Sequence, residues 1–331
     1  MILIDAVGIN RGGGKILLDY LIQEIDLNFN NILFLFDKRI LNNHPKINNN
    51  KTIYIKNNFI DRLLFYLKNK NKFSKVLCLA NYSPPVKLDS KVFTLFQNVA
   101  IFDKLIYSGP IPFAKRIIFN CHLKNTDNWI VQTPSVKNLL LSKFDIKNEI
   151  YIYPFFSFKN FSLTNRVLKK HNQILYVSDG DPHKNHIRLF NAFNKFSKIN
   201  PNFQLIVTIS NNYPGLLDLI EKYNSNGISI KNIGFVSQKK LAKYFKTSMF
   251  FVYPSLEESF GLGLIEAANY KLPVVASDLD YVYDVINPVQ TFDPYSEEDI
   301  LKALMNYKNY KLNKSKVIVE DNIKGLIQLL K

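Results

Sequence analysis

The sequence predicts an α/β protein made of two Rossmann-like domains whose parallel sheets face a shared cleft. Short apolar runs alternate with longer segments of helical periodicity along the chain, which is typical of parallel strands joined by right-handed helical crossovers. The 331 residues, 47% of them hydrophobic, are enough for two globular domains. Because parallel strands bring their carboxyl ends to one edge of a sheet, we expect ligand-binding residues in the loops that follow the strands.

The first domain is predicted over residues 1–155. Its apolar runs predict strands at residues 2–7, 32–36, 52–55, 76–79, 92–95 and 128–131. Helical patterns lie between them, including residues 15–25 and 62–67. A stretch without periodicity at residues 156–170 is predicted to be the linker to the second domain.

The second domain is predicted over residues 171–310, and one or two helices are expected in residues 296–331. Apolar runs predict its strands at residues 173–177, 204–209, 228–233, 249–253 and 273–276. Helices are predicted between them at residues 186–197, 214–223, 239–246 and 264–270. Both domains therefore show the same alternation of strand and helix.

The net charge of +16 indicates either an anionic partner or a compositional bias toward lysine and asparagine. Residues 1–150 hold 21 Lys and Arg against 11 Asp and Glu. The two cysteines, Cys78 and Cys121, are far apart and lack metal-ligand spacing, which favours a reducing compartment. No apolar run is long enough to span a bilayer and the first residues do not resemble a signal peptide, so we expect a cytoplasmic protein.

A glycine-rich turn occupies residues 8–15, between the first predicted strand and a helix. Gly12, Gly13 and Gly14 let the backbone approach a diphosphate closely and donate N–H groups to it. The turn is not a phosphate-binding loop of the Walker type, because Ile16 stands where Ser or Thr would bind magnesium. A tight structural turn is the alternative interpretation.

A second glycine-punctuated loop follows the strand predicted to end at residue 253 and leads into a helix. Glu258 and Glu266 lie eight positions apart across this junction. N–H groups at a helix N-terminus bind anions, and a carboxylate inside the same helix can accept hydrogen bonds from sugar hydroxyls. Phosphate beside a polyol is the chemistry of a nucleotide sugar.

This stretch resembles the Glu-x7-Glu signature of the retaining glycosyltransferases of family 4, which have the GT-B fold, and the likeness extends over residues 234–278. The resemblance implies that Glu258 contacts the donor sugar, Glu266 the ribose and Lys184 the diphosphate, and we treat these three as the catalytic residues. The implied donor-binding residues are Gly12, Gly13, Gly14, Arg188, Gly234, Phe235, Ser259, Phe260, Gly261 and Leu262. A C-terminal helix within residues 311–331 is implied to pack back on the first domain.

The chain departs from the family pattern at two places. Asp179 stands where family members carry a phosphate-binding arginine, so either Arg188 supplies a second cation beside Lys184 or the phosphate is held with less positive charge. A histidine that many members carry after the fifth strand is absent, and we expect Asn98, with Arg11, to line the acceptor side of the cleft. The pattern Gly-x-x-His-Lys-Asn-His at residues 180–186 resembles that of transferases of the O-antigen type.

Asp179-Gly180-Asp181 is also an Asp-x-Asp pattern, which binds a divalent ion in the other glycosyltransferase fold. Because Asp278-Leu279-Asp280 repeats the pattern, we give it little weight and predict no metal and no cofactor. His183 and His186 have no acidic or cysteine partner at ligand spacing and are not predicted to bind zinc.

The resemblance implies a retaining, metal-independent glycosyltransferase that moves a sugar from a nucleotide diphosphate sugar to a growing surface polysaccharide, an O-antigen or capsule acceptor that is lipid-linked. Apolar residues beside lysines at residues 60–75 and 111–124 predict peripheral contact with the cytoplasmic face of an anionic inner membrane. We expect no nucleic-acid partner. Two alternatives stay open, a nucleotide-sugar epimerase of the GT-B fold and a non-catalytic basic binding protein.

Overall fold

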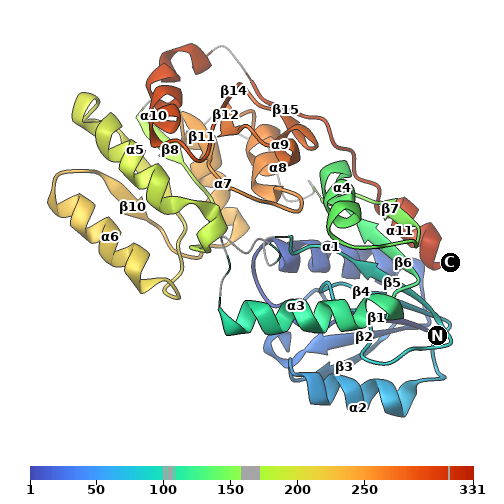
Figure 1. The fold of residues 1–331 in the computed structure, drawn as a ribbon. Helices are drawn as coiled ribbons and strands as arrows, with labels where there is room; N and C mark the ends of the chain where they lie inside the picture. Colours follow the sequence, from blue (N-terminus) through green and yellow to red (C-terminus); the bar gives the residue numbers. More distant parts are fainter. Residues whose placement is uncertain (100–101, 103–106, 108, 158–171, 312–313) are drawn as a thin grey trace. The chain divides into compact units, whose positions relative to one another are not determined.

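The structure, a computed structural model, describes residues 1–99, 102, 107, 109–157, 172–311 and 314–331. The chain divides into two compact units (Figure 1). Unit 1 consists of Met1–Ser157 and Glu320–Lys331, and unit 2 of Phe158–Val319. Of the linker predicted at residues 156–170, only residues 156 and 157 are described; the rest lies outside the described residues.

Unit 1 contains a seven-stranded sheet with the order β3-β2-β1-β4-β5-β6-β7, in which every pairing between neighbours is parallel. Its strands are β1 (Ile2–Ala6), β2 (Ile32–Asp37), β3 (Lys51–Ile55), β4 (Lys75–Cys78), β5 (Lys91–Leu95), β6 (Asn128–Val131) and β7 (Ile150–Ile152). Its helices are α1 (Gly12–Asn28), α2 (Phe59–Asn69), α3 (Pro110–His122), α4 (Pro134–Lys143) and α11 (Ile323–Leu330). The sequence prediction missed β7, a strand of only three residues.

The C-terminal segment is held to unit 1 by hydrogen bonds on both sides of the start of α11. The hydroxyl of Tyr20 donates to Asp321 at 2.8 Å, and the backbone N–H of Asn322 donates to the carbonyl of Pro154 at 2.7 Å. Lys75 Nζ donates to the carbonyl of Leu329 at 3.1 Å. In the described part of residues 311–331, the α-helix is Ile323–Leu330.

Unit 1 also contains a buried polar cluster that the sequence pattern does not reveal. Asp5, near the carboxyl end of β1, accepts hydrogen bonds from Arg62 Nε at 2.8 Å and from the hydroxyl of Tyr66 at 2.7 Å. Arg62 further donates to the carbonyls of Ser83 and Tyr82. A buried carboxylate is tolerated only when it is paired in this way, so the cluster locks α2 onto β1.

Unit 2 contains a six-stranded parallel sheet with the order β10-β9-β8-β11-β12-β14. Its strands are β8 (Gln173–Leu175), β9 (Gln204–Val207), β10 (Ile230–Asn232), β11 (Phe250–Tyr253), β12 (Val274–Ser277) and β14 (Gln290–Phe292), and β13 (Ile286–Asn287) pairs separately with β15 (Lys316–Val317). Its helices are α5 (His186–Ile199), α6 (Pro214–Ser225), α7 (Gln238–Thr247), α8 (Leu262–Asn269), α9 (Asp280–Tyr283) and α10 (Glu297–Met305).

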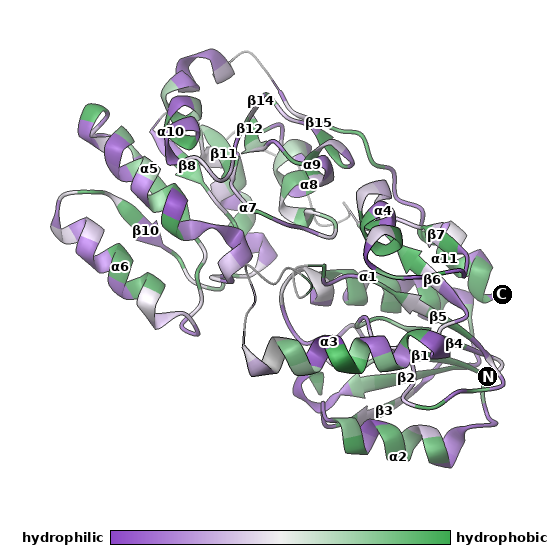
Figure 2. Ribbon diagram, viewed as in Figure 1, coloured by the Kyte–Doolittle hydropathy of each residue, from purple (hydrophilic) through white to green (hydrophobic). Residues whose placement is uncertain are grey.

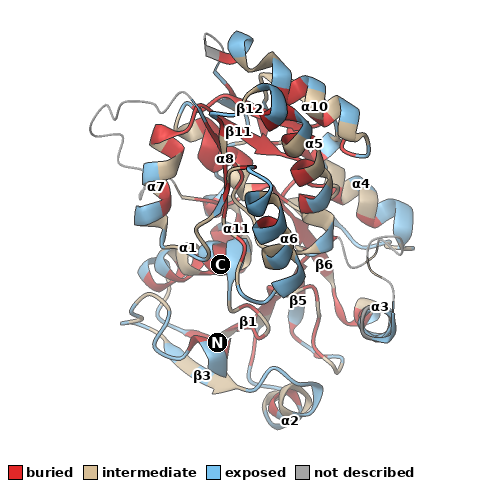
Figure 3. Ribbon diagram, turned by 90° about the vertical axis from the view of Figure 1, so that its left-hand side faces the viewer, coloured by how far each residue is buried: buried red, intermediate tan, exposed pale blue. Residues whose placement is uncertain are grey.

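The cores of the two units lie along their central strands, where β1, β11 and β12 are almost wholly buried (Figure 3). This explains why continuous apolar runs, rather than alternating ones, marked these strands in the sequence. Most predicted strands and helices are present, with ends that differ by one to three residues. No helix within the described residues is long and apolar enough to cross a membrane.

Candidate functional site

The predicted site residues of unit 2 follow the carboxyl ends of its strands, the edge at which open parallel sheets bind ligands. Lys184 lies in a short 3₁₀ helix (Pro182–Lys184) after β8, Gly234 follows β10, and Glu258 follows β11. Glu266 lies in α8, the helix that the loop after β11 leads into. The fold thus collects on one edge residues that are up to 82 positions apart in the chain.

Lys184 and Glu258 form an ion pair, with Lys184 Nζ 2.5 Å from Glu258 Oε1. The hydroxyl of Tyr253, which the sequence analysis did not single out, donates to the same oxygen at 2.8 Å. Burial by itself raises the pKa of the Glu258 carboxyl, but the Lys184 ammonium and these hydrogen bonds outweigh it, so the pKa is lowered. Glu258 is therefore an oriented carboxylate at neutral pH.

The loop that carries Lys184 is fastened to the neighbouring loops by its own backbone and by Asn185. Asn185 has a left-handed conformation, with φ of +60°, and its side chain donates to the carbonyls of Pro254 at 3.0 Å and Pro294 at 2.8 Å. The hydroxyl of Tyr176 donates to the carbonyl of Lys184 at 2.7 Å. These contacts join the loops after β8 and β11, so Lys184 and Glu258 are held against each other by the fold.

Glu266 is buried, with only 6% of its surface exposed, and its carboxyl forms no hydrogen bond or ion pair with any described residue. Burial raises its pKa to about 7. The two oxygens are not among the fully enclosed side-chain atoms that lack a partner, so solvent or a ligand can reach them. A carboxylate in this position can accept hydrogen bonds from the vicinal hydroxyl groups of a ligand.

Two helices have a glycine at or just before their first residue and lack a capping side chain. Gly261, with φ of +68°, precedes α8, and Gly12, with φ of +65°, begins α1; in neither helix does the N-cap residue supply a side-chain hydrogen bond. Their first N–H groups are therefore open to an anion. The predicted helix at residues 15–25 begins earlier than expected, so Gly13 and Gly14 lie in its first turn and not in a preceding loop.

Arg188 is held at the first turn of α5. Its Nη1 donates to Asn185 Oδ1 at 3.0 Å, and its guanidinium lies 5.8 Å from the centre of the Tyr295 ring. Arg188 thereby braces the asparagine that positions Lys184. Its role toward a diphosphate stays a prediction.

At the end of β10, Gly234 has φ of +62° and its N–H donates to Asn232 Oδ1 at 3.1 Å. This turn leaves Phe235 81% exposed. On the loop after β11, Phe260 is buried and Ser259 is half-buried. An exposed aromatic ring at the carboxyl edge offers a flat surface on which a base can stack.

In unit 1, Arg11 precedes α1 at the carboxyl end of β1 and is exposed, and Asn98 follows β5 with an exposed side chain. The backbone of Asn98 is held by Asn81, whose Oδ1 accepts from the N–H of Asn98 at 3.0 Å and whose Nδ2 donates to its carbonyl at 3.0 Å. Arg11, Gly12 and Asn98 therefore all belong to the carboxyl edge of the unit 1 sheet.

The two carboxylates of the Asp-x-Asp pattern accept hydrogen bonds from different protein groups. Asp179 accepts from the N–H and the hydroxyl of Ser210 at 3.0 and 3.1 Å, whereas Asp181 accepts from the hydroxyl of Tyr213 at 2.7 Å. Asp179 therefore fastens the loop after β8 to the loop after β9, which is a structural role that an arginine could not fill. No group of three or more potential metal ligands occurs among the described residues.

His183 and His186 are neutral near pH 7. Burial, with the nearby Lys184 ammonium, lowers the pKa of His183 to about 4 and that of His186 to about 3. The ring of His186 packs 4.8 Å from that of Tyr176, centre to centre, so this histidine lies in the interior rather than on a polar face of the helix.

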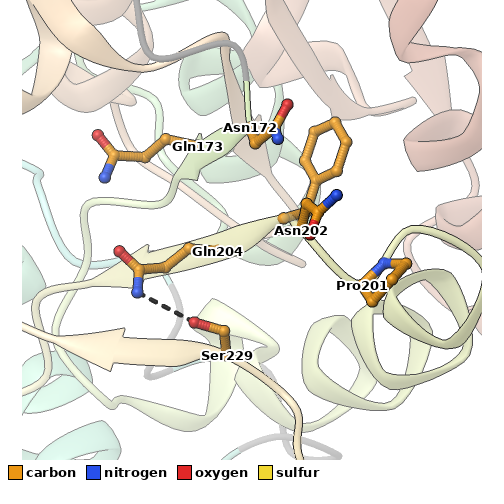
Figure 4. A pocket seen from close by; sticks show the side chains of 7 residues that line it. Asn172, Gln173, Pro201, Asn202, Gln204 and Ser229 are labelled. Atoms are coloured by element: carbon orange, nitrogen blue, oxygen red, sulfur yellow. Dashed lines mark hydrogen bonds between the residues drawn. The ribbon is translucent and has the colours of Figure 1, made fainter.

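A hollow of about 280 Å³ lies at the opposite edge of the unit 2 sheet (Figure 4). It is lined by Asn172, Gln173, Pro201, Asn202, Phe203, Gln204 and Ser229, where Gln204 donates to Ser229 at 3.0 Å. Because Gln173 and Gln204 begin β8 and β9, this is the amino edge, away from the catalytic candidates.

Comparison with known proteins decides the family. The model of the glycosyl transferases group 1 family matches residues 159–324, half of the chain. The chain belongs to this family. It is 26% identical over 208 residues to the amylovoran biosynthesis glycosyltransferase AmsD of Erwinia amylovora, a match that covers 61% of this chain and 58% of AmsD.

Two solved structures of related fold cover the chain almost completely. WaaG, a glycosyltransferase involved in lipopolysaccharide biosynthesis, is 12% identical with a TM-score of 0.73 and covers 100% of both chains. HepE of Anabaena, solved in complex with UDP and glucose, is 12% identical with a TM-score of 0.67, covering 99% of this chain and 94% of its own. The predicted GT-B fold of this group 1 member is thereby confirmed.

Proposed function

We propose that the protein is a retaining, metal-independent glycosyltransferase that takes a sugar from a nucleotide diphosphate sugar. One observation carries the proposal: Glu266 is a buried carboxyl without a partner among the described residues, in the helix that begins uncapped after Gly261. An anion site and a hydroxyl acceptor on one short helix match the two chemical features of a nucleotide sugar.

The side chains suggest a division of roles. Glu266 would accept hydrogen bonds from the ribose hydroxyls, and Glu258, oriented by Lys184 and Tyr253, would accept from a sugar hydroxyl. Lys184 and the N–H groups after Gly261 would stabilise the negative charge that develops on the departing diphosphate. Family membership and the geometry of the loops support this assignment.

In the reaction that we propose, the bond between the anomeric carbon and the diphosphate oxygen breaks as the acceptor hydroxyl attacks from the same face of the sugar. The hydroxyl proton passes to the leaving phosphate oxygen, so no protein side chain is required as a base. The diphosphate leaves with the electron pair of the broken bond. Lys184 and the helix N–H groups would stabilise the negative charge that it gains.

For the acceptor we propose a growing surface polysaccharide that is lipid-linked. The names of AmsD and WaaG refer to amylovoran and lipopolysaccharide biosynthesis, which supports a glycan acceptor, and the UDP and glucose bound to HepE support a nucleotide-sugar donor. A lipid-linked acceptor also fits the excess of basic residues in residues 1–150 and a peripheral place on an inner membrane.

The test is nucleotide release by the purified protein from a panel of UDP-, GDP-, ADP- and TDP-sugars in EDTA, beside Glu266→Ala and Lys184→Ala. Glu221→Ala and Lys222→Ala, which change exposed residues of α6, are the matched controls. We expect slow release from one donor, lost in both site variants and kept in both controls. The anomeric configuration of the transferred sugar, read by NMR, tests retention.

Three other outcomes would contradict parts of the proposal. Release that requires added divalent metal contradicts metal independence. Conversion of the donor to its epimer without any acceptor identifies an epimerase. If no donor of the panel binds or reacts, the roles proposed for Glu266 and Lys184 toward a nucleotide sugar are refuted.

A further inference from the structure

Helix α2 of unit 1 presents apolar side chains to solvent as well as to the core. Phe65 and Tyr66 are buried against the sheet, whereas Ile60, Leu64 and Leu67 are 66%, 59% and 55% exposed. The spacing i, i+4, i+7 places the exposed three in one stripe along the helix. The solvent-facing side of a surface helix normally carries polar residues, so this apolar stripe indicates a binding site for a partner.

Helix α3 repeats the arrangement. Its Phe119 packs in the core beside Trp129, whereas Phe113 and Ile117, one helical turn apart, are 60% and 47% exposed. In Figure 2, hydrophobic and hydrophilic segments alternate along both helices. Both α2 and α3 therefore expose apolar residues on the side that faces solvent. These residues belong to a feature shared by two helices and are not isolated exposures.

The two helices lie on the same face of the unit 1 sheet. Cys78, which packs with α2, is in register with Thr94, and Thr94 is in register with Trp129, which packs with α3. Residues in register on neighbouring strands point to the same face. The rings of Phe59 and His122 stack 6.2 Å apart and bring α2 and α3 together. We call the exposed apolar residues of these helices the α2–α3 surface.

The α2–α3 surface is bordered by positive charge. Exposed lysines flank it at both helices: Lys56, Lys68, Lys70, Lys72, Lys115 and Lys124. Residues 109–124 contain no acidic residue, and residues 56–75 contain one, Asp61. Apolar side chains bordered by lysines match the two layers of an anionic bilayer surface, hydrocarbon below and phosphate above.

We propose that unit 1 docks on anionic lipid bilayers through the α2–α3 surface. Nucleic acid would satisfy the lysines but leave the leucines and isoleucines facing water. A second copy of the chain would bring a surface of the same positive charge and be repelled. The proposal rests on the proposed function in one respect, because docking would bring the enzyme to a lipid-linked acceptor.

The experiment is co-sedimentation of the full chain with vesicles of phosphatidylcholine alone or with 30 mol% phosphatidylglycerol, a probe composition on the order of natural anionic content. The variants are Leu64→Gln/Leu67→Gln and Lys68→Gln/Lys70→Gln/Lys72→Gln. The matched controls are Leu27→Gln, at a 77% exposed leucine of α1, and Lys198→Gln/Lys222→Gln/Lys231→Gln, which removes three exposed lysines of unit 2. Far-UV circular dichroism checks that each variant is folded.

We expect binding to the anionic vesicles only, weakened at least ~10-fold by the leucine pair and by the lysine triple, and unchanged in both controls. Binding of the wild type should also fall as salt increases. Absence of binding, or equal binding by variants and controls, overturns the proposal. The proposal is also overturned if Leu64→Gln/Leu67→Gln abolishes self-association or RNA binding but leaves vesicle binding intact. Since no donor or acceptor is present, failure here leaves glycosyl transfer untouched, and failure of transfer leaves vesicle binding standing.

Discussion

The carboxyl of Glu266 should lower the stability of the ligand-free protein at neutral and alkaline pH. Burial raises its pKa from 4.5 to about 7. Each pH unit corresponds to ~1.4 kcal/mol, so ionising the folded protein costs about 3 kcal/mol. The folded state binds this proton more tightly than the unfolded state, so the contribution to stability is complete below about pH 4.5 and is lost as pH rises through about 7.

Glu266→Gln keeps the shape of the side chain but cannot ionise. We therefore expect equal stability of variant and wild type near pH 4.5, and an advantage of the variant that grows to about 3 kcal/mol at pH 8, or roughly 6–12 °C in Tm for a unit of this size. Far-UV circular dichroism is the suitable signal, because the sole tryptophan, Trp129, lies in unit 1. Glu221→Gln, at an exposed position on α6, is the control.

The same variant should lose ligand binding while it gains stability. If Glu266 accepts hydrogen bonds from ribose hydroxyls, loss of its charge should weaken nucleotide binding about 10- to 100-fold by calorimetry, and wild-type affinity should rise between pH 6 and pH 8. Lower stability of Glu266→Gln at pH 8 would show that the carboxyl has a protein partner. Unchanged nucleotide affinity would remove its role in binding.

Three further predictions concern the loops after β8 and β11. Lys184→Met leaves the partly buried Glu258 carboxylate without its cation, so we expect nucleotide release to slow ~10²–10³-fold and stability to fall by about 3 kcal/mol. Urea denaturation should show partial recovery in Lys184→Met/Glu258→Gln, and an additive double variant would contradict the pairing. Tyr253→Phe removes the hydroxyl that orients Glu258 and should lower kcat/KM about tenfold with the fold intact, whereas an unchanged kcat/KM rules out that role. Gly180→Ala would place a Cβ 2.4 Å from Tyr213 Cγ, so we expect a loss of about 1–3 kcal/mol in unfolding free energy, and wild-type stability would show that the ring can move aside.

The elements that the sequence predicted well are those whose signal is local. Continuous apolar runs marked the central strands, since these are buried on both faces. The edge strands β7 and β14, of three residues each, were missed. Gly12 was placed in a loop rather than at the start of α1, because a glycine with positive φ at a helix start looks in sequence like any turn.

Sequence alone determined the two-domain α/β class and the positions of Glu258, Glu266 and Lys184 after strands or in the following helix, because these depend on residue order and hydrophobic period. Tertiary structure decided what each carboxyl does. Glu258 forms polar contacts with Lys184 and Tyr253, whereas the Glu266 carboxyl forms no hydrogen bond or ion pair with a described residue, and the difference follows from which loops the sheet order brings together. The pKa values of the two carboxyls diverge for the same reason: burial acts on both, but a neighbouring charge offsets it at Glu258.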